Sequence, residues 1–188
     1  FADSVHLENL YFTDNQLNGF NGFSLKAKQY AYVKNTIVKN TLSNCRAMSY
    51  HISDSKSVII ENVTEDKART ASISDGRIGA IFLANHNILL NNCRISNGYS
   101  TEPIAFQVSC IEQADDFEAG EVYFNNVLIF NNQTIVDPWD LALIHISDDY
   151  NTITLNNWTV ANNYGNNKAI TFGGLGATLN NCIFYNPD

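Results

Sequence analysis

The chain has 188 residues, of which 45% are hydrophobic and 16% are charged, so it can fold around a core and is not a disordered chain. Its net charge of -8 argues against nucleic acid as the main partner, because phosphate binding needs a basic surface; the alternative is that the charge only keeps the protein soluble. No apolar run in the sequence reaches the ~18 residues of a membrane-spanning helix, so we expect no membrane span.

An alternating apolar and polar pattern around one asparagine recurs along the chain. The recurring segments are 5–15, 31–40, 58–66, 88–97, 122–132, 153–163 and 177–186. We call the central asparagines the anchors; they are Asn9, Asn35, Asn62, Asn92, Asn126, Asn157 and Asn181. Their spacing varies from 24 to 34 residues. A helical solenoid rarely varies so much, whereas a β-solenoid lengthens its outer loops without disturbing the stack.

Four columns of residues keep a constant distance from the anchors. The positions four and two before each anchor, and one and three after it, are apolar throughout except at Thr36 and Glu65. Alternation with a period of two on both sides of the anchor predicts two short strands, each with one buried face.

The anchor itself interrupts the alternation. Asparagine adopts the left-handed conformation more readily than any residue except glycine, and one such residue turns the chain sharply. We expect the anchors to be buried and to form a ladder of amide hydrogen bonds; the competing interpretation is that asparagine only favours turns. Asn62 and Asn157 also begin Asn-x-Thr sequons, as does Asn132. Because buried anchors are inaccessible, we expect these glycosylation motifs to be coincidental.

A second polar column lies five residues after the anchors and contains Asp14, Asn40, Lys67, Asn97, Asn131, Asn162 and Asn186. A third strand precedes most anchor segments, over 23–27, 48–53, 80–84, 104–109, 143–147 and 169–172. Three strands and three turns for each repeat predict an all-β fold, a right-handed single-stranded parallel β-helix of about seven coils. We expect one domain over residues 1–188 that belongs to a longer chain with further coils or domains.

The cysteines do not form a CxxC pair, which argues against a zinc ribbon. Cys93 and Cys182 occupy equivalent positions three coils apart, about 14 Å at the usual strand spacing. This distance is too long for a disulfide, so we expect two small buried hydrophobic residues.

Three stretches, HISDSKSVIIENV, FLANHNILLNNCRISN and HISDDYNTITLNNWTVANN, resemble the repeats of the pectate-lyase-like superfamily of right-handed β-helices. The closest likeness is to its carbohydrate-binding and sugar-hydrolase repeats. The resemblance covers nearly the whole chain and implies a fold, because members range from lyases and hydrolases to tailspikes and adhesins. It also implies that the third strands form the sheet whose outer face carries the cleft in enzymes of the family, and it implies a secreted or cell-surface location.

On these third strands, alternation predicts an outward stripe formed by His51, Phe82, Gln107 and His145. Two histidines, an amide and an aromatic ring on one face could together bind a sugar. The alternative interpretation is that these residues belong to an ordinary exposed sheet face without a binding role. Trp139, in a loop entering the same sheet, is a candidate for stacking on a sugar ring, as is Tyr99; packing back onto the coil is equally consistent with the sequence.

Asp148 and Asp149 follow the stripe directly. With His145 they are the candidate catalytic residues, since paired carboxylates serve as acid and base in glycoside hydrolysis. Adjacent aspartates are also common in turns, and the Gly-His-Gly and Arg-x-Lys motifs of polygalacturonases are absent from the sequence. Arg77 is a candidate for the cationic group that lyase chemistry needs beside a sugar carboxylate. The alternative interpretation is that Arg77 only belongs to a long solvated loop.

Asp115, Asp116 and Glu118 lie in the most acidic stretch of the chain. Carboxylate oxygens suit Ca²⁺, which is the only cofactor that the sequence suggests. The spacing matches no regular Ca²⁺ motif, so a solvated acidic turn is the simpler interpretation.

Two functions compete at this stage. The first is an extracellular module that binds or processes a polysaccharide or another glycan. The second is a non-catalytic surface adhesin or structural repeat domain. The first predicts a groove over the stripe, and the second predicts a flat and featureless sheet.

Overall fold

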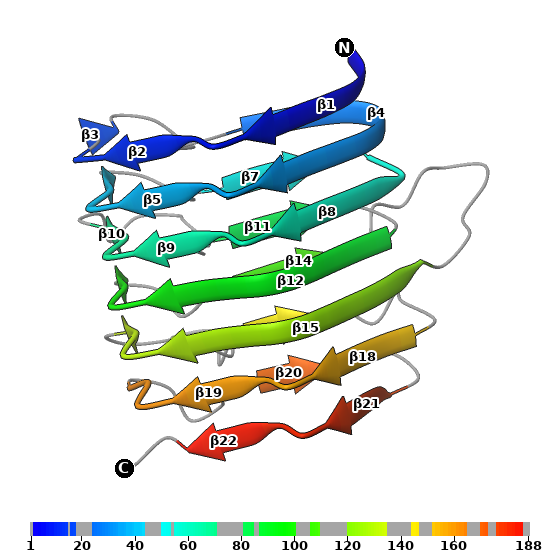
Figure 1. Ribbon diagram of the computed structural model, residues 1–188. Helices are drawn as coiled ribbons and strands as arrows, with labels where there is room; N and C mark the ends of the chain where they lie inside the picture. Colours follow the sequence, from blue (N-terminus) through cyan, green and yellow to red (C-terminus); the bar gives the residue numbers. More distant parts are fainter. Residues whose placement is uncertain are drawn as a thin grey trace.

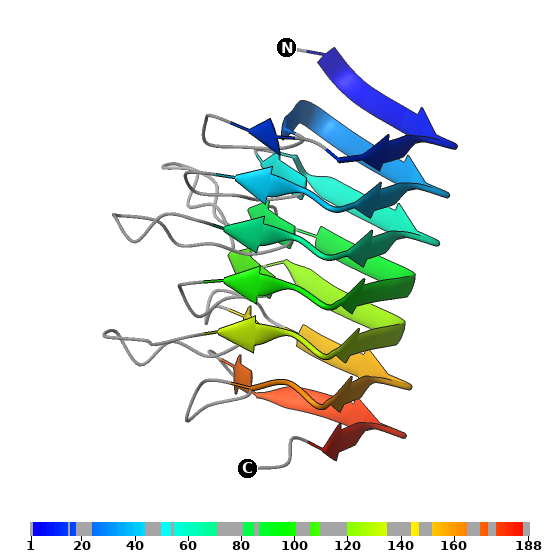
Figure 2. The ribbon, with the colours of Figure 1, turned by 90° about the vertical axis from the view of Figure 1, so that its left-hand side faces the viewer.

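The computed structural model describes residues 2–14, 16–17, 24–43, 50–53, 55–70, 81–84, 87–100, 106–109, 120–134, 144–146, 152–164, 170–172 and 176–185. Within these ranges all regular structure is β-strand, and every strand pairing is parallel. The strands stack from β1 near the N-terminus to β22 near the C-terminus (Figure 1). Figure 2, turned by 90°, shows the same stack from the side.

The strands that precede the anchors form one continuous ladder. Each pairs in register with its equivalent in the next repeat, so that Ile88 of one strand pairs with Val58 before it and Val122 after it. These strands are β1 (Ala2–Glu8), β4 (Ser24–Lys34), β8 (Ser57–Glu61), β12 (Asn87–Ser96), β15 (Glu121–Phe130), β18 (Thr152–Asn156) and β21 (Ala177–Asn180).

The strands that follow the anchors stack in the same way. They are β2 (Tyr11–Thr13), β5 (Ile37–Lys39), β9 (Thr64–Asp66), β19 (Thr159–Ala161) and β22 (Ile183–Tyr185). The strands β12 and β15 run through their anchors and supply both halves of the pair. The two predicted strands on either side of the anchor are therefore confirmed.

The predicted third strands are also confirmed over the residues that the structure describes. They are β7 (Tyr50–Ser53), β11 (Ile81–Ala84), β14 (Phe106–Ser109), β17 (Ile144–Ile146) and β20 (Ile170–Phe172). In the first repeat this strand is the start of β4, which continues into the next ladder.

A further five-stranded sheet was not predicted. Its strands are two residues long, too short to carry an alternation signal. They are β3 (Gln16–Leu17), β6 (Leu42–Ser43), β10 (Arg69–Thr70), β13 (Tyr99–Ser100) and β16 (Gln133–Thr134).

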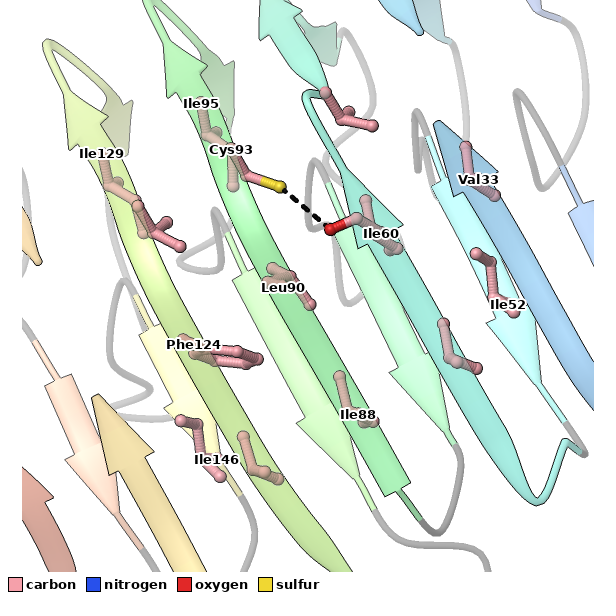
Figure 3. Close-up of a cluster of buried hydrophobic side chains, with 14 of the residues drawn as sticks. Val33, Ile52, Ile60, Ile88, Leu90, Cys93, Ile95, Phe124, Ile129 and Ile146 are labelled. Atoms are coloured by element: carbon pink, nitrogen blue, oxygen red, sulfur yellow. Dashed lines mark hydrogen bonds between the residues drawn. The ribbon is translucent and has the colours of Figure 1, made fainter. Parts of the chain in front are cut away.

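The four predicted columns form the core (Figure 3). Every column position in the repeats anchored from Asn35 to Asn157 is buried, including the two polar exceptions, Thr36 and Glu65. Ile52 of β7 and Ile146 of β17 close the core from the side of the third strands. Cys93 is a free, buried thiol, as predicted, whereas Cys182 is free but only half-buried and not buried as expected.

All the anchors have the predicted left-handed backbone, with φ between 50° and 58°. The prediction that their side chains are buried is wrong, because all of them are exposed except Asn35, which is half-buried. The reason is geometric: the residues two before and one after each anchor both face inward, so the anchor and the residue before it face outward. Asn62 and Asn157 are therefore accessible, and the argument that their sequons are buried fails. Asn132 is buried.

The ladder exists on this outer surface. The Nδ2 atom of each anchor donates to the Oδ1 atom of the one before it over the run from Asn9 to Asn126, at 2.7–3.2 Å. The run is interrupted where Asn157 donates to Asn125 at 3.4 Å instead of to Asn126, and it resumes at Asn181.

The second polar column also has left-handed backbone at all six of its described positions, including Lys67 with φ 63°. Because Lys67 has no side-chain acceptor, the amide of Asn97 donates to Asp66 at 2.6 Å. In-register parallel stacking with asparagine ladders is compatible with a β-helix or another solenoid.

Candidate functional site

The predicted stripe is brought together by backbone register. Phe82 of β11 pairs with His51 of β7 and with Gln107 of β14, and Gln107 pairs with His145 of β17. Neighbouring strands in a sheet lie about 4.8 Å apart, so the four positions form one straight row across four consecutive strands. The structure describes the backbone of these positions but not their side chains, so the row is established at the level of the main chain.

The residue after each stripe position forms a second row. Ile52, Leu83, Val108 and Ile146 pair in that order, and the two ends of the row, Ile52 and Ile146, are fully buried. Ile52 and Ile146 therefore face the core, and the outward direction of the stripe side chains stays a prediction from the alternation of the sequence.

The other predicted site residues lie outside the described residues. They are the candidate acid and base Asp148 and Asp149, the binding residues Arg77 and Trp139, and the Ca²⁺ ligands Asp115, Asp116 and Glu118. In the part of the chain that is described, no group of three or more His, Cys, Asp or Glu residues could hold a metal ion.

A polar and aromatic cluster that the sequence analysis missed lies on the outer face of β1, β4 and β8. The Tyr32 hydroxyl donates to Glu61 Oε2 at 2.6 Å. This hydrogen bond to a carboxylate, with a smaller contribution from burial, raises the pKa of Tyr32 to about 12. The His6 ring packs on Tyr32 with 4.6 Å between ring centroids. Tyr30, two residues earlier on β4, stacks against Tyr32 with 6.3 Å between ring centroids.

This cluster continues along the stack. The position three residues before each anchor faces outward, and it is occupied by His6, Tyr32, Ile59, Leu89 and Tyr123 in consecutive repeats. Alternation predicts polar residues there, so the run of aromatic and aliphatic side chains at an outward position was the signal available in the sequence. At the far end of the run, Asn156 Nδ2 donates to the Tyr123 hydroxyl at 2.7 Å.

Comparison of the chain with protein-family models, with curated proteins and with solved structures finds no match. Among the described residues there is no helix of the length and apolarity that a membrane crossing requires.

Proposed function

We propose that the chain is a stretch of right-handed parallel β-helix of about seven coils, of the pectate-lyase-like type, and that it binds or processes an extracellular polysaccharide. The proposed setting is a secreted or cell-surface protein that carries further coils or domains. The observation that carries the proposal is the common register of His51, Phe82, Gln107 and His145 on four consecutive parallel strands.

A row of this kind suits an extended saccharide. An aromatic ring packs against the C–H face of a sugar, while imidazole and amide groups exchange hydrogen bonds with its hydroxyl groups. The strands supply these groups at a regular spacing of about 4.8 Å, and the buried side chains of Ile52 and Ile146 pack the same strands against the core. A rigid support lowers the entropy lost on binding.

The catalytic form of the proposal assigns roles to the residues that follow the stripe. Asp148 and Asp149 would act as acid and base on a glycosidic bond, with His145 beside them. Arg77 would neutralise a sugar carboxylate in a lyase reaction, and Trp139 would stack on a sugar at the edge of the row. Asp115, Asp116 and Glu118 would bind a Ca²⁺ ion that bridges to an acidic sugar.

A structural or adhesive repeat is the second candidate, and the outer asparagine ladder favours it. Four successive anchor-to-anchor hydrogen bonds from Asn9 to Asn126 stabilise length and regularity along the stack. A spacer that displays other domains needs both properties and no binding row.

Binding and turnover measurements separate the two. The full chain is tested on a glycan array and in reducing-sugar and unsaturated-product assays, together with Phe82→Ala, His145→Ala and Asp149→Ala. Thr178→Ala, an exposed position on β21 away from the row, is the matched control. Saccharide binding that Phe82→Ala and His145→Ala abolish and Thr178→Ala leaves intact supports the proposal, and loss of turnover in Asp149→Ala supports its catalytic form. A folded chain without binding or turnover leaves the structural repeat as the function.

A further inference from the structure

A row of exposed side chains runs along the sheet of two-residue strands. Arg69 of β10 pairs with Tyr99 of β13, Tyr99 pairs with Gln133 of β16, and Gln133 forms a parallel bridge with Tyr164. The side chains of all four residues are exposed, Tyr99 to 36% and Tyr164 to 49%. We call them the tyrosine row. At about 4.8 Å for each strand, the two tyrosines lie about 10 Å apart, with the glutamine between them.

Backbone hydrogen bonds fix the row. The backbone nitrogens of Tyr99, Gln133 and Tyr164 donate to carbonyl oxygens of the preceding repeat at 2.8–2.9 Å. Arg69 N makes the equivalent bond to Thr41 O at 2.8 Å. The same pattern of backbone hydrogen bonds therefore runs through four consecutive repeats.

Buried asparagines lie immediately before two members of the row and lock its backbone. Asn132 Oδ1 accepts from Gly98 N at 2.9 Å, and Asn163 Oδ1 accepts from Asn132 N at 3.0 Å. The Nδ2 atoms of Asn132 and Asn163 donate to the carbonyls of Ile95 and Ile129. Hydrogen bonds made by buried amide side chains are costly to break.

Gly98 completes this support. A Cβ atom at position 98 would lie 2.8 Å from Asn132 Oδ1, so a side chain there would displace the buried amide. The backbone under Tyr99 is thus held by a glycine and an amide that fit each other. A binding surface prepared in this way loses little conformational entropy when a ligand binds.

The chemistry of the row selects among ligands. Two tyrosine rings offer apolar faces with polar edges, the glutamine offers both a donor and an acceptor, and the guanidinium of Arg69 offers donors only. Sugars need this combination, because their C–H faces are apolar and their hydroxyl groups both donate and accept. Single-stranded nucleic acid also stacks on aromatic rings, but it needs a basic groove, whereas the row has one cation and the chain a net charge of -8.

We propose that the tyrosine row is a second saccharide-binding surface, which takes a neutral oligosaccharide extended along the stack with sugar rings on Tyr99 and Tyr164. Gln133 exchanges hydrogen bonds with the sugar between them, and Arg69 donates to hydroxyl oxygens at one end. The inference rests on the proposed polysaccharide-binding function and adds a site that is separate from the His51–His145 row.

The test measures binding of neutral hexasaccharides, namely cellohexaose, xylohexaose and maltohexaose, to the full chain by titration calorimetry. Tyr99→Ala and Tyr164→Ala are each expected to weaken the Kd about tenfold. Tyr99→Phe keeps the ring and should bind like the unmodified chain. Tyr11→Ala removes a tyrosine that is 61% exposed on β2, outside the row, and is the matched control.

The outcomes distinguish this inference from the proposed function. Suppose that the chain binds a saccharide and that Phe82→Ala or His145→Ala weakens this binding. If Tyr99→Ala and Tyr164→Ala then leave the binding unchanged, the inference about the tyrosine row is wrong and the proposed function stands. If the folded chain binds no saccharide in calorimetry or on the array, both fail. Binding of a single-stranded oligonucleotide that depends on both tyrosines, without saccharide binding, overturns the assignment to sugars.

Discussion

The indole of Trp158 lies parallel to the ring of Phe124 in the core, with 5.4 Å between ring centroids and 4° between ring planes. The two residues come from neighbouring repeats and from different columns, and both are fully buried. Phe124 lies on β15 just before the anchor Asn126, and Trp158 directly follows the next anchor, Asn157. The stacked rings therefore join two neighbouring repeats. Among the described residues, the Trp158 Nε1 atom has no hydrogen-bond acceptor, so packing alone holds the indole in place.

We predict that Trp158→Ala lowers the free energy of unfolding by about 3–5 kcal/mol, because it removes a large buried side chain and leaves a cavity. Urea unfolding followed by circular dichroism measures the loss. Trp158→Phe should cost less, since it keeps an aromatic ring and removes a buried donor. A double-mutant cycle with Phe124→Leu should give a coupling of about 0.5–1.5 kcal/mol. A loss below about 1 kcal/mol in Trp158→Ala would contradict the packing described.

Lys67→Asn should stabilise the chain. Lys67 is the only described member of the second polar column that is neither Asn nor Asp, yet it has the same left-handed backbone. Asparagine accepts this conformation at lower cost, so we expect a gain of about 0.5–1 kcal/mol in the free energy of unfolding. The reverse change at an equivalent site, Asn131→Lys, is the control and should destabilise by a similar amount. Equal stability of Lys67→Asn and the unmodified chain would show that the conformation is not strained at this position.

Cys93 and Cys182 should differ sharply in thiol reactivity. Burial raises the pKa of Cys93 to about 12, an effect that weak backbone hydrogen bonds only partly offset. Its thiol therefore stays protonated and inaccessible near neutral pH, whereas the half-buried Cys182 is accessible. Iodoacetamide labelling followed by peptide mass mapping should modify Cys182 in the folded chain and Cys93 only after denaturation. Equal labelling of both in the folded state would refute the buried position.

The same pKa shift predicts a loss of stability in alkali. The unfolded thiol ionises at a pKa of about 8.5, below the folded value of about 12. The stabilisation is complete below the unfolded pKa and declines progressively as the pH rises from that value to the folded one. Unfolding measured between pH 8 and pH 11 should show this decline, and Cys93→Ala should reduce it.

Glu61→Gln should lower the pKa of Tyr32 from about 12 toward its ordinary value of 10.0, because the hydrogen bond to the Glu61 carboxylate is the main cause of the shift. NMR titration of ring-labelled tyrosine measures the change. Glu8→Gln removes a carboxylate that contributes least to the shift and should leave the pKa nearly unchanged. A similar pKa in all three proteins would mean that the hydrogen bond does not form in solution.

The sequence predicts the structure well at positions that recur in every repeat with the same requirement, such as positive φ or burial. The turn at Asn92 follows from the tolerance of asparagine for positive φ, and the burial of Trp158 and even Glu65 follows from their column. The same reasoning failed on the direction of the anchor side chains. The amide ladder was expected in the interior, whereas two inward residues flank an outward pair at each turn, and the anchor belongs to that pair.

The sites were predictable only in part. The alignment of His51 with Phe82 follows from strand register, which alternation fixes strongly. The Tyr32–Glu61 hydrogen bond depends on rotamers of residues in different repeats, which no periodic pattern encodes. The tyrosine row was missed because Tyr99 and Gln133 lie on strands of two residues. Tyr99 had been noted as a stacking candidate, but its alignment with Gln133 and Tyr164 emerges only from the backbone pairing.

The in-register pairing of the described strands before the anchors makes the surface over them periodic. Over these strands each repeat advances an outward position by the same step of about 4.8 Å, although the anchors are 24 to 34 residues apart. A polymer whose own repeat is commensurate with that step can engage each level in the same way, and its contacts add by avidity. A polymer with a different period drifts out of phase within a few units, so periodicity alone discriminates between chains of similar chemistry.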